Sequence, residues 1–363
     1  MKKKDPHSAL RVQQGIEQPP NLNPYLNNSL RKKKTLSLEE YIEGIKNGNR
    51  TILSKAITLI ESTLPEHLLL SRQIVEACLP FSGNSIRIGI TGVPGVGKST
   101  FIESFGQIII KKEHRLAVLA IDPSSERSGG SILGDKTRME TLAIEPNAFI
   151  RPSPSGCNLG GVARRTRESI ILCEAAGFDI IFIETVGVGQ SETVVHSMVD
   201  VFLLLMLAGA GDELQGIKRG IMEMSDILAI TKADGINQRK CEVAAREYMN
   251  ALQYMPLPES GWKPKVLTCS SVTGLGMNEL WETLQHYFEF VNKNNYFEQR
   301  RHHQSKYWMY ETISDLLKEH FYGTKAIKEM LAIMEQEVVQ NKISSIAAAE
   351  KIIHTYFNFF KEK

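Results

Sequence analysis

The chain lacks several features that would assign it to a specialised class of protein. Its five cysteines include no C-x-x-C pair, which argues against a disulfide framework and against a structural zinc site. Its 43 basic and 41 acidic residues leave a net charge of only +2, so no excess of one sign attracts it to nucleic acid or to an anionic membrane. We therefore expect a reducing, cytoplasmic location and neither a nucleic acid nor a membrane as a partner.

Long apolar segments are also absent from the sequence. The apolar run at residues 201–208 is less than half of the ~20 residues that a membrane-spanning helix needs. The basic start of the chain, residues 1–6, is not followed by the apolar core of a secretory signal. Export is therefore not expected, and the run at 201–208 predicts a buried strand.

Composition and periodicity divide the chain into four regions. Residues 1–35 are rich in Asn, Gln, Pro and Lys, which predicts a disordered tail. Residues 36–80 show helical apolar spacing broken near Gly48 and predict a helical extension, and residues 81–294 predict the main domain. Residues 295–363 are wholly helical in pattern. This last region fits either a helical cap on its own sheet or a dimerisation element.

Short apolar runs alternate with helical stretches between residues 81 and 294. Strands buried on both faces have this composition, and the alternation predicts an α/β fold with a mostly parallel sheet and helices on both faces. Ligands of such sheets bind beyond the carboxyl ends of the strands. The predicted strands lie at residues 86–91, 116–122, 180–185, 201–207, 227–231 and 266–269.

The first predicted strand leads directly into a phosphate-binding sequence, G-x-x-x-x-G-K-S, and a helix follows it. Glycines at these spacings let backbone N–H groups approach phosphate oxygens at the start of the helix. Lys98 is expected to reach the β- and γ-phosphates, and the Ser99 hydroxyl is expected to bind Mg²⁺. The residues predicted to contact the nucleotide here are Gly92, Val93, Pro94, Gly95, Val96, Gly97, Lys98, Ser99 and Thr100.

Acidic residues follow the next two predicted strands. Asp122 ends the second strand, Asp135 lies in the polar segment after it, and Glu184 lies at the tip of the third. Together with Ser99 they are predicted to hold Mg²⁺, although a simple turn or a helix N-cap is the alternative for Asp122. The backbone N–H of Gly187 is predicted to sense the γ-phosphate, and Gln190 is a candidate for orienting the attacking water.

Two further loops predict which base is bound. The carboxylate of Asp234 can accept hydrogen bonds from both N1–H and N2–H₂ of guanine, a pair that adenine does not offer, so GTP and GDP are the expected nucleotides. Lys232 can lie along the base, and Thr231 stands where the usual guanine motif has Asn. Backbone N–H groups that can meet the guanine oxygen come from the loop after the last strand, at Ser270, Ser271 and Val272.

Taken together, the sequences at 92–99, 122–139, 184–192 and 208–218 resemble the MeaB/ArgK family. These proteins are GTPase chaperones of methylmalonyl-CoA mutase, within the wider class of metallocentre-assembly P-loop GTPases. The resemblance runs from about Ser37 to the C-terminal helices. It implies slow Mg²⁺-dependent GTP hydrolysis, a homodimer formed through the C-terminal helices, and docking onto an adenosylcobalamin-dependent acyl-CoA mutase, so that nucleotide state gates cofactor loading and protects the mutase.

The resemblance also assigns the loop at 208–218 to the family's additional switch, the one that signals to the mutase. The candidate catalytic residues are then Lys98, Glu184, Gln190 and Lys218. Two other functions remain open. A nickel-type metallochaperone GTPase would need soft or imidazole ligands near the switches, and the sequence offers no such group. An ATP-dependent kinase linked to basic amino-acid transport would need an acceptor pocket and a base, and Asp234 favours guanine instead.

Overall fold

The computed structural model describes residues 36–121, 139–152, 159–185, 192–209 and 219–361. It divides the chain into two units, Met1–Ser37 and Leu38–Lys363, and all of the described helices and strands belong to the second. The tail predicted at residues 1–35 lies outside the described residues. Among the helices of the described part, none has both the length and the apolar character that crossing a membrane requires.

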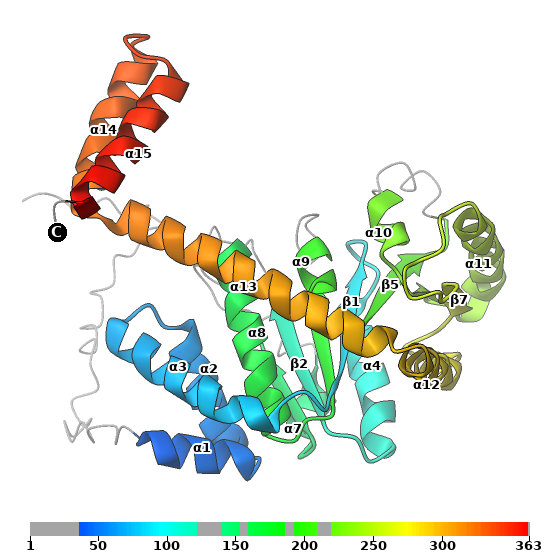
Figure 1. The fold of residues 1–363 in the computed structure, drawn as a ribbon. Helices are drawn as coiled ribbons and strands as arrows, with labels where there is room; N and C mark the ends of the chain where they lie inside the picture. The colour runs from blue at the N-terminus through cyan, green and yellow to red at the C-terminus, as the bar shows by residue number, and fades with distance from the viewer. Residues whose placement is uncertain (1–35, 122–138, 153–158, 186–191, 210–218, 362–363) are drawn as a thin grey trace, which may run out of the picture. The chain divides into compact units, whose positions relative to one another are not determined.

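A seven-stranded parallel sheet runs through the second unit in the order β3-β2-β4-β1-β5-β6-β7 (Figure 1). The predicted α/β fold with a parallel sheet is thereby confirmed, and six strands match their predicted positions to within one residue. The strands are β1 (Ile86–Gly92), β2 (Leu116–Ile121), β3 (Ala148–Arg151), β4 (Ile180–Thr185), β5 (Val201–Leu207), β6 (Ile227–Thr231) and β7 (Lys265–Thr268).

The strand that was not predicted is β3, at one edge of the sheet. It has four residues, of which only the first two are fully buried, so its sequence lacks the long apolar run of the central strands. The unpaired side of this strand faces the helix that carries Arg50. Arg50 donates from Nη1 to the carbonyl oxygens of Glu145 and Ala148, at 2.6 and 2.7 Å. A charged side chain over an edge strand hinders its pairing with another chain.

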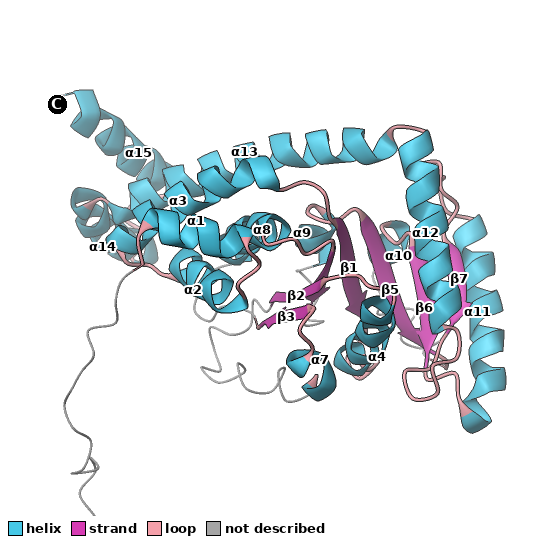
Figure 2. Cartoon of the chain, turned by 90° about the horizontal axis from the view of Figure 1, so that it is seen from below, coloured by secondary structure: helices cyan, strands magenta, loops and turns pink. Residues whose placement is uncertain are grey.

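Helices cover both faces of the sheet (Figure 2). On one face aromatic side chains form the core, with Phe105 stacked on Phe182 and tilted against Trp281. The helices of that face are α4 (Lys98–Lys111), α7 (Glu140–Ile144) and α12 (Met277–Lys293). The helices of the other face are α8 (Leu159–Ala175), α9 (Glu192–His196), α10 (Arg219–Glu223) and α11 (Gln238–Gln253).

Three helices precede the sheet, and α2 and α3 pack against α8. The first two are separated at Gly48, whose φ of 69° suits glycine, and Asn49 then caps α2 by accepting hydrogen bonds from the N–H groups of Thr51 and Ile52. The predicted helical break near Gly48 is thus observed. The helices are α1 (Leu38–Lys46), α2 (Arg50–Glu61) and α3 (Pro65–Cys78), followed by the short η1 (Leu79–Phe81).

After α12 the described chain is helical to its end. The helix α13 has 28 residues, of which only Gln304 is buried, so most of its surface is not covered by this chain. The helices α14 and α15 pack on each other through a small cluster built around Ile327, Met334 and Ile352. The three helices are α13 (Tyr296–Gly323), α14 (Lys325–Val339) and α15 (Ser345–Lys361).

Candidate nucleotide-binding site

The described site residues lie at the carboxyl ends of four strands, β1, β4, β6 and β7. These strand ends are on the same side of the parallel sheet. The chain passes from β1 to β2 in one direction and later to β5 in the other, so the loop after β1 lies where the strand order reverses. Such a point is the usual ligand site of an open parallel sheet. Register places Glu184 of β4 beside Ile90 of β1, immediately before the phosphate-binding loop.

The glycines of this loop hold the conformation that a phosphate cradle requires. Gly95 and Gly97 have φ angles of 76° and 90°, in the left-handed region that other residues avoid. A Cβ on Gly92 would lie 2.6 Å from the Leu205 carbonyl oxygen, so only glycine lets β1 approach β5 this closely. The helix α4 begins at Lys98, and its first N–H groups therefore point into the loop as a ready anion-binding site.

Lys98 is folded back into the loop that it follows. Its ammonium group donates to the Gly92 carbonyl oxygen at 2.9 Å. Burial lowers the pKa of Lys98, while the charges of Glu184 and Glu192 act in the opposite direction. A partly desolvated cation that has a neutral carbonyl oxygen as its hydrogen-bond partner gains most from an anionic ligand, and a phosphate is the anion that this loop fits.

Glu184 is buried at the tip of β4, with 6% of its surface exposed. The next residue, Thr185, shares a hydrogen bond of 2.8 Å with the hydroxyl of Thr91, which precedes Gly92. The two threonines therefore tie the end of β4 to the start of the phosphate-binding loop. Together, the hydroxyl of Ser99 and the carboxylate of Glu184 provide hard oxygen ligands of the kind Mg²⁺ prefers, and these residues fit that ion.

Five other residues predicted for this site lie outside the described residues, and they are Asp122, Asp135, Gly187, Gln190 and Lys218.

The end of β6, where the base-binding residues were predicted, is joined directly to the phosphate-binding loop. The buried Thr231 hydroxyl donates to the Val96 carbonyl oxygen at 3.0 Å and lies 3.3 Å from that of Met206. Thr231 therefore links the two loops from the position where the usual guanine motif has Asn. Lys232 has a φ of 59°, unusual for a side chain of this size, and its ammonium group donates to the Gly95 carbonyl oxygen at 2.9 Å.

Asp234 is held in place by the loop after β7. The Ser270 hydroxyl donates to its Oδ2 at 2.5 Å and accepts the N–H groups of Val272 and Thr273, at 3.3 and 3.2 Å. The Val272 N–H, predicted to meet the guanine oxygen, is thus engaged with Ser270 in this structure. Asp234 begins the short η3 (Gly235–Asn237) as its N-cap residue. One carboxylate, oriented by a serine hydroxyl, remains available to read a base edge.

Three contacts were missing from the sequence predictions. The Thr91–Thr185 pair, the bond from Thr231 to the phosphate-binding loop, and the buried carboxylate of Glu192 near Lys98 all join segments far apart in the chain. A threonine at the tip of each strand was the available signal, because a hydroxyl ending an apolar run needs a partner once it is buried.

This fold and this site define a P-loop nucleotide-binding protein. The family model described as "Methylmalonyl Co-A mutase-associated GTPase MeaB" matches residues 53–326. The chain belongs to this family and is a GTPase, which confirms the resemblance found in the sequence.

Similar proteins cover nearly the whole of this chain. A "Putative GTPase" of Caulobacter vibrioides is 49% identical over 85% of this chain and 94% of its own length. The "GTPase ArgK" of Escherichia coli is 45% identical over 80% and 87%. The "Methylmalonic aciduria type A homolog, mitochondrial" of Mus musculus is 42% identical over 90% and 81%. A solved structure described as a "LAO/AO transport system kinase" has a TM-score of 0.71 and 35% identity, and covers 89% of this chain and 99% of that one.

Proposed function

We propose that this GTPase is a Mg²⁺-dependent chaperone of an adenosylcobalamin-dependent acyl-CoA mutase, in which GTP binding and hydrolysis gate cofactor loading and protect the mutase. The observation that carries the proposal is the family match, because the matched residues 53–326 include every strand of the sheet and the family is described as mutase-associated. The mammalian relative is named for methylmalonic aciduria, which supports a link to the same metabolism.

The site residues have distinct roles in this proposal. The loop from Gly92 to Thr100 binds the phosphates through its N–H groups, and Lys98 neutralises the β- and γ-phosphates. Asp234 reads guanine through N1–H and N2–H₂, with Ser270 orienting its carboxylate. Lys232 lies along the base, and the adjoining loop residues Ser271 and Val272 complete the base site.

A magnesium ion would be held by the Ser99 hydroxyl and, through water, by Glu184. Asp122 and Asp135 are proposed as further ligands from the segment after β2. When bound, the ion neutralises charge on the phosphates during hydrolysis. Gly187 is proposed to sense the γ-phosphate, Gln190 to orient the attacking water, and Lys218 to belong to the switch that signals to the mutase.

The C-terminal helices are proposed to form a homodimer. This proposal is supported by large apolar side chains that are exposed on α13. Among them, Tyr310, Ile313 and Leu317 are 65%, 46% and 60% exposed. We propose residues 36–80 as a helical extension, 81–294 as the GTPase domain and 295–363 as the dimerisation region. A cytoplasmic location is proposed because the described cysteines are all free thiols.

A kinase function is the second candidate, favoured by the description of the similar solved structure as a transport system kinase. The Asp234–Ser270 arrangement favours guanine over adenine, and we therefore rank this function lower. A metallochaperone function has less support. Within the described residues, no group of three or more His, Cys, Asp or Glu side chains is placed to hold a metal ion.

The test is cofactor loading of a mutase that has been stripped of cobalamin. Adenosylcobalamin uptake, followed by its absorbance, is expected to depend on whether GTP or GDP accompanies the wild-type protein. Lys98→Ala, which removes the phosphate-binding cation, is expected to abolish nucleotide binding and this dependence. Lys111→Ala, at the other end of α4, is the matched control. If GTP and GDP support the same loading and the same mutase lifetime, the proposed function is wrong.

A further inference from the structure

The short helix α9 lies between the phosphate-binding loop and the long helix α13. Its first residue, Glu192, is buried, and its charge raises the pKa of Lys98 against the effect of burial. The N-terminal end of α9 is therefore close enough to the phosphate-binding loop for its carboxylate to act on the charge of Lys98. Val195, on the same helix, packs against the centre of β1, where a Cβ on Gly89 would lie 3.0 Å from a Val195 methyl group.

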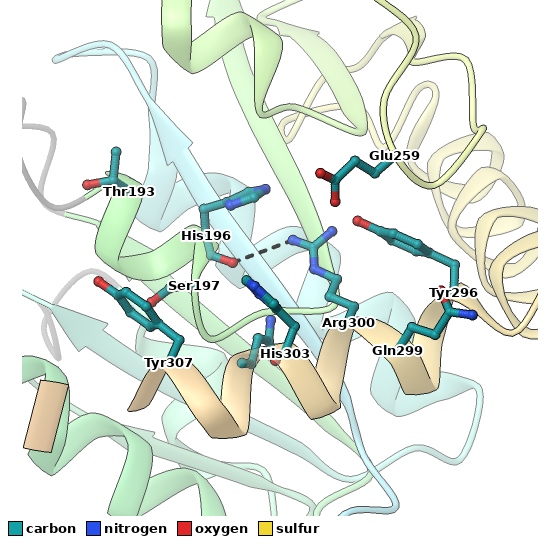
Figure 3. A pocket seen from close by; sticks show the side chains of 10 residues that line it. Thr193, His196, Ser197, Glu259, Tyr296, Gln299, Arg300, His303 and Tyr307 are labelled. Carbon is teal, nitrogen blue, oxygen red and sulfur yellow. Dashed lines mark hydrogen bonds between the residues drawn. The ribbon is translucent and has the colours of Figure 1, made fainter. Parts of the chain in front are cut away.

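The other end of α9 is bound by side chains of α13. Gln304 donates from Nε2 to the Val199 carbonyl oxygen at 2.8 Å, and the Trp308 indole N–H donates to that of Ser197 at 3.0 Å. Arg300 donates to the His196 carbonyl oxygen at 3.4 Å (Figure 3). Residues 300, 304 and 308 recur every four positions, so one face of α13 satisfies three carbonyl groups of the turn that ends α9.

Asp200 fixes this part of α13 to the sheet. Its carboxylate accepts hydrogen bonds from Arg301 at 2.9 and 2.7 Å, and it also accepts the Arg87 N–H of β1 at 2.8 Å. The Arg301–Asp200 pair is therefore a firm anchor, one residue beyond the carbonyl of Val199.

A pocket of about 520 Å³ adjoins this contact, between α9 and the first half of α13 (Figure 3). Thr193 and His196 line it from α9, and Tyr296, His303 and Tyr307 line it from α13. The turn is thus held by directed hydrogen bonds rather than by tight packing on that side. Open space beside hydrogen-bonded groups permits a small displacement without creating overlap.

We propose that Gln304 and Trp308 are positioning residues for GTP hydrolysis, because they hold the helix that follows the Glu184 strand and carries Glu192. This inference rests on the nucleotide site proposed above. Through these bonds, the nucleotide state at Lys98 is coupled to α13. The same helix presents Tyr310, Ile313 and Leu317, the side chains proposed above to face a second copy of this chain, so dimerisation there alters hydrolysis through α9.

Two conservative variants test the positioning role without a partner. Gln304→Met and Trp308→Phe each remove one N–H donor while keeping most of the side-chain volume. We expect kcat for GTP hydrolysis to fall about fivefold, which corresponds to the loss of one hydrogen bond. The Kd for GDP is expected to stay nearly unchanged. Lys306→Gln, exposed on the same helix, is the control. If both variants lower only the melting temperature and keep the wild-type kcat, the bonds are merely structural and the proposal is wrong.

The fluorescence of Trp308 reports the coupling in the intact protein. The difference in emission between the wild type and Trp308→Phe isolates Trp308 from the other two tryptophans. We expect this difference spectrum to shift when GDP is replaced by a non-hydrolysable GTP analogue. An identical spectrum with both nucleotides would overturn the link even where GTP is hydrolysed normally. Failure of the wild type to bind either nucleotide would instead overturn the proposed site, and the link with it.

Discussion

Asp234 and Ser270 form the contact on which the proposed base specificity of the site depends. A carboxylate can accept two hydrogen bonds from guanine, but only if its plane faces the base edge. The Ser270 hydroxyl occupies one oxygen of Asp234 at 2.5 Å and is itself oriented by the N–H groups of its own loop. The orientation of the carboxylate is therefore set before any nucleotide binds.

The first prediction concerns the base preference of Asp234→Asn. An amide replaces one acceptor with a donor, so it no longer matches guanine but can meet the C2 carbonyl oxygen of xanthine. We expect weaker GTP binding, by roughly tenfold or more for the lost charge-assisted bond, and stronger binding of xanthosine triphosphate. Competition against a fluorescent nucleotide measures both. Glu247→Gln on α11 is the control. Unchanged GTP affinity in Asp234→Asn would rule out a role of Asp234 in recognising guanine.

The second prediction concerns pH and His196. Burial, aided by the nearby Arg300, lowers the pKa of His196 from 6.5 to about 3, so the unfolded chain binds the proton more readily. Its contribution to stability is complete above pH 6.5 and is lost as the pH falls towards 3. At pH 5.5 the loss is on the order of 1 kcal/mol. Urea unfolding should show this loss of stability in the wild type and a smaller loss in His196→Phe. Equal losses in the two proteins would contradict the attribution to His196.

Among the elements, the junction of β7 with α12 positions the loop that carries Ser270. Gly276 caps α12 with a φ of 74°, and a Cβ there would lie 2.0 Å from the Thr268 carbonyl oxygen. The loop of residues 270–275 is thus closed over the end of β7 by a contact that only glycine permits. The position of Ser270, and through it that of Asp234, depends on this closure.

The third prediction is that Gly276→Ala damages both stability and guanine binding. The backbone overlap must be relieved by moving the loop, which costs more than the roughly 1 kcal/mol of an unfavourable φ alone. Gly274→Ala has nearly the same φ, 76°, but its Cβ would meet nothing within 4 Å, so it measures the φ cost by itself. Thermal unfolding and GDP titration compare the two. Equal effects of the two substitutions would show that the overlap is unimportant.

Sequence patterns predicted the elements that depend on local composition. The five central strands were predictable because each is an apolar run buried on both faces, and the phosphate-binding loop because its spacing is fixed by chemistry. The two edge strands, β3 and β7, have four residues each and few buried ones, and of these two only β7 was predicted. The Thr231–Val96 bond and the contacts of Gln304 and Trp308 join segments about a hundred residues apart, and no local signal encodes which segments meet.

At the scale of the whole molecule, the fourth prediction concerns the homodimer. Burying the exposed apolar side chains of α13 in a second copy would remove them from water, and two glutamates at that face would oppose this. We expect light scattering to report the mass of two chains for the wild type and of one chain for the double variant Ile313→Glu, Leu317→Glu. Asn278→Glu with Gln285→Glu on α12 adds the same charge elsewhere. A dimer that survives the α13 changes would place the interface on another surface.

The central claim is that this GTPase works with a cobalamin-dependent mutase, and its most direct test is the rate of nucleotide hydrolysis. GTP and ATP hydrolysis by the purified protein are measured with and without an adenosylcobalamin-dependent acyl-CoA mutase. We expect the mutase to accelerate hydrolysis of GTP and to leave ATP unaffected. GTP hydrolysis that is unchanged by the mutase, or mutase-independent transfer of phosphate from ATP to a small molecule, would contradict the claim.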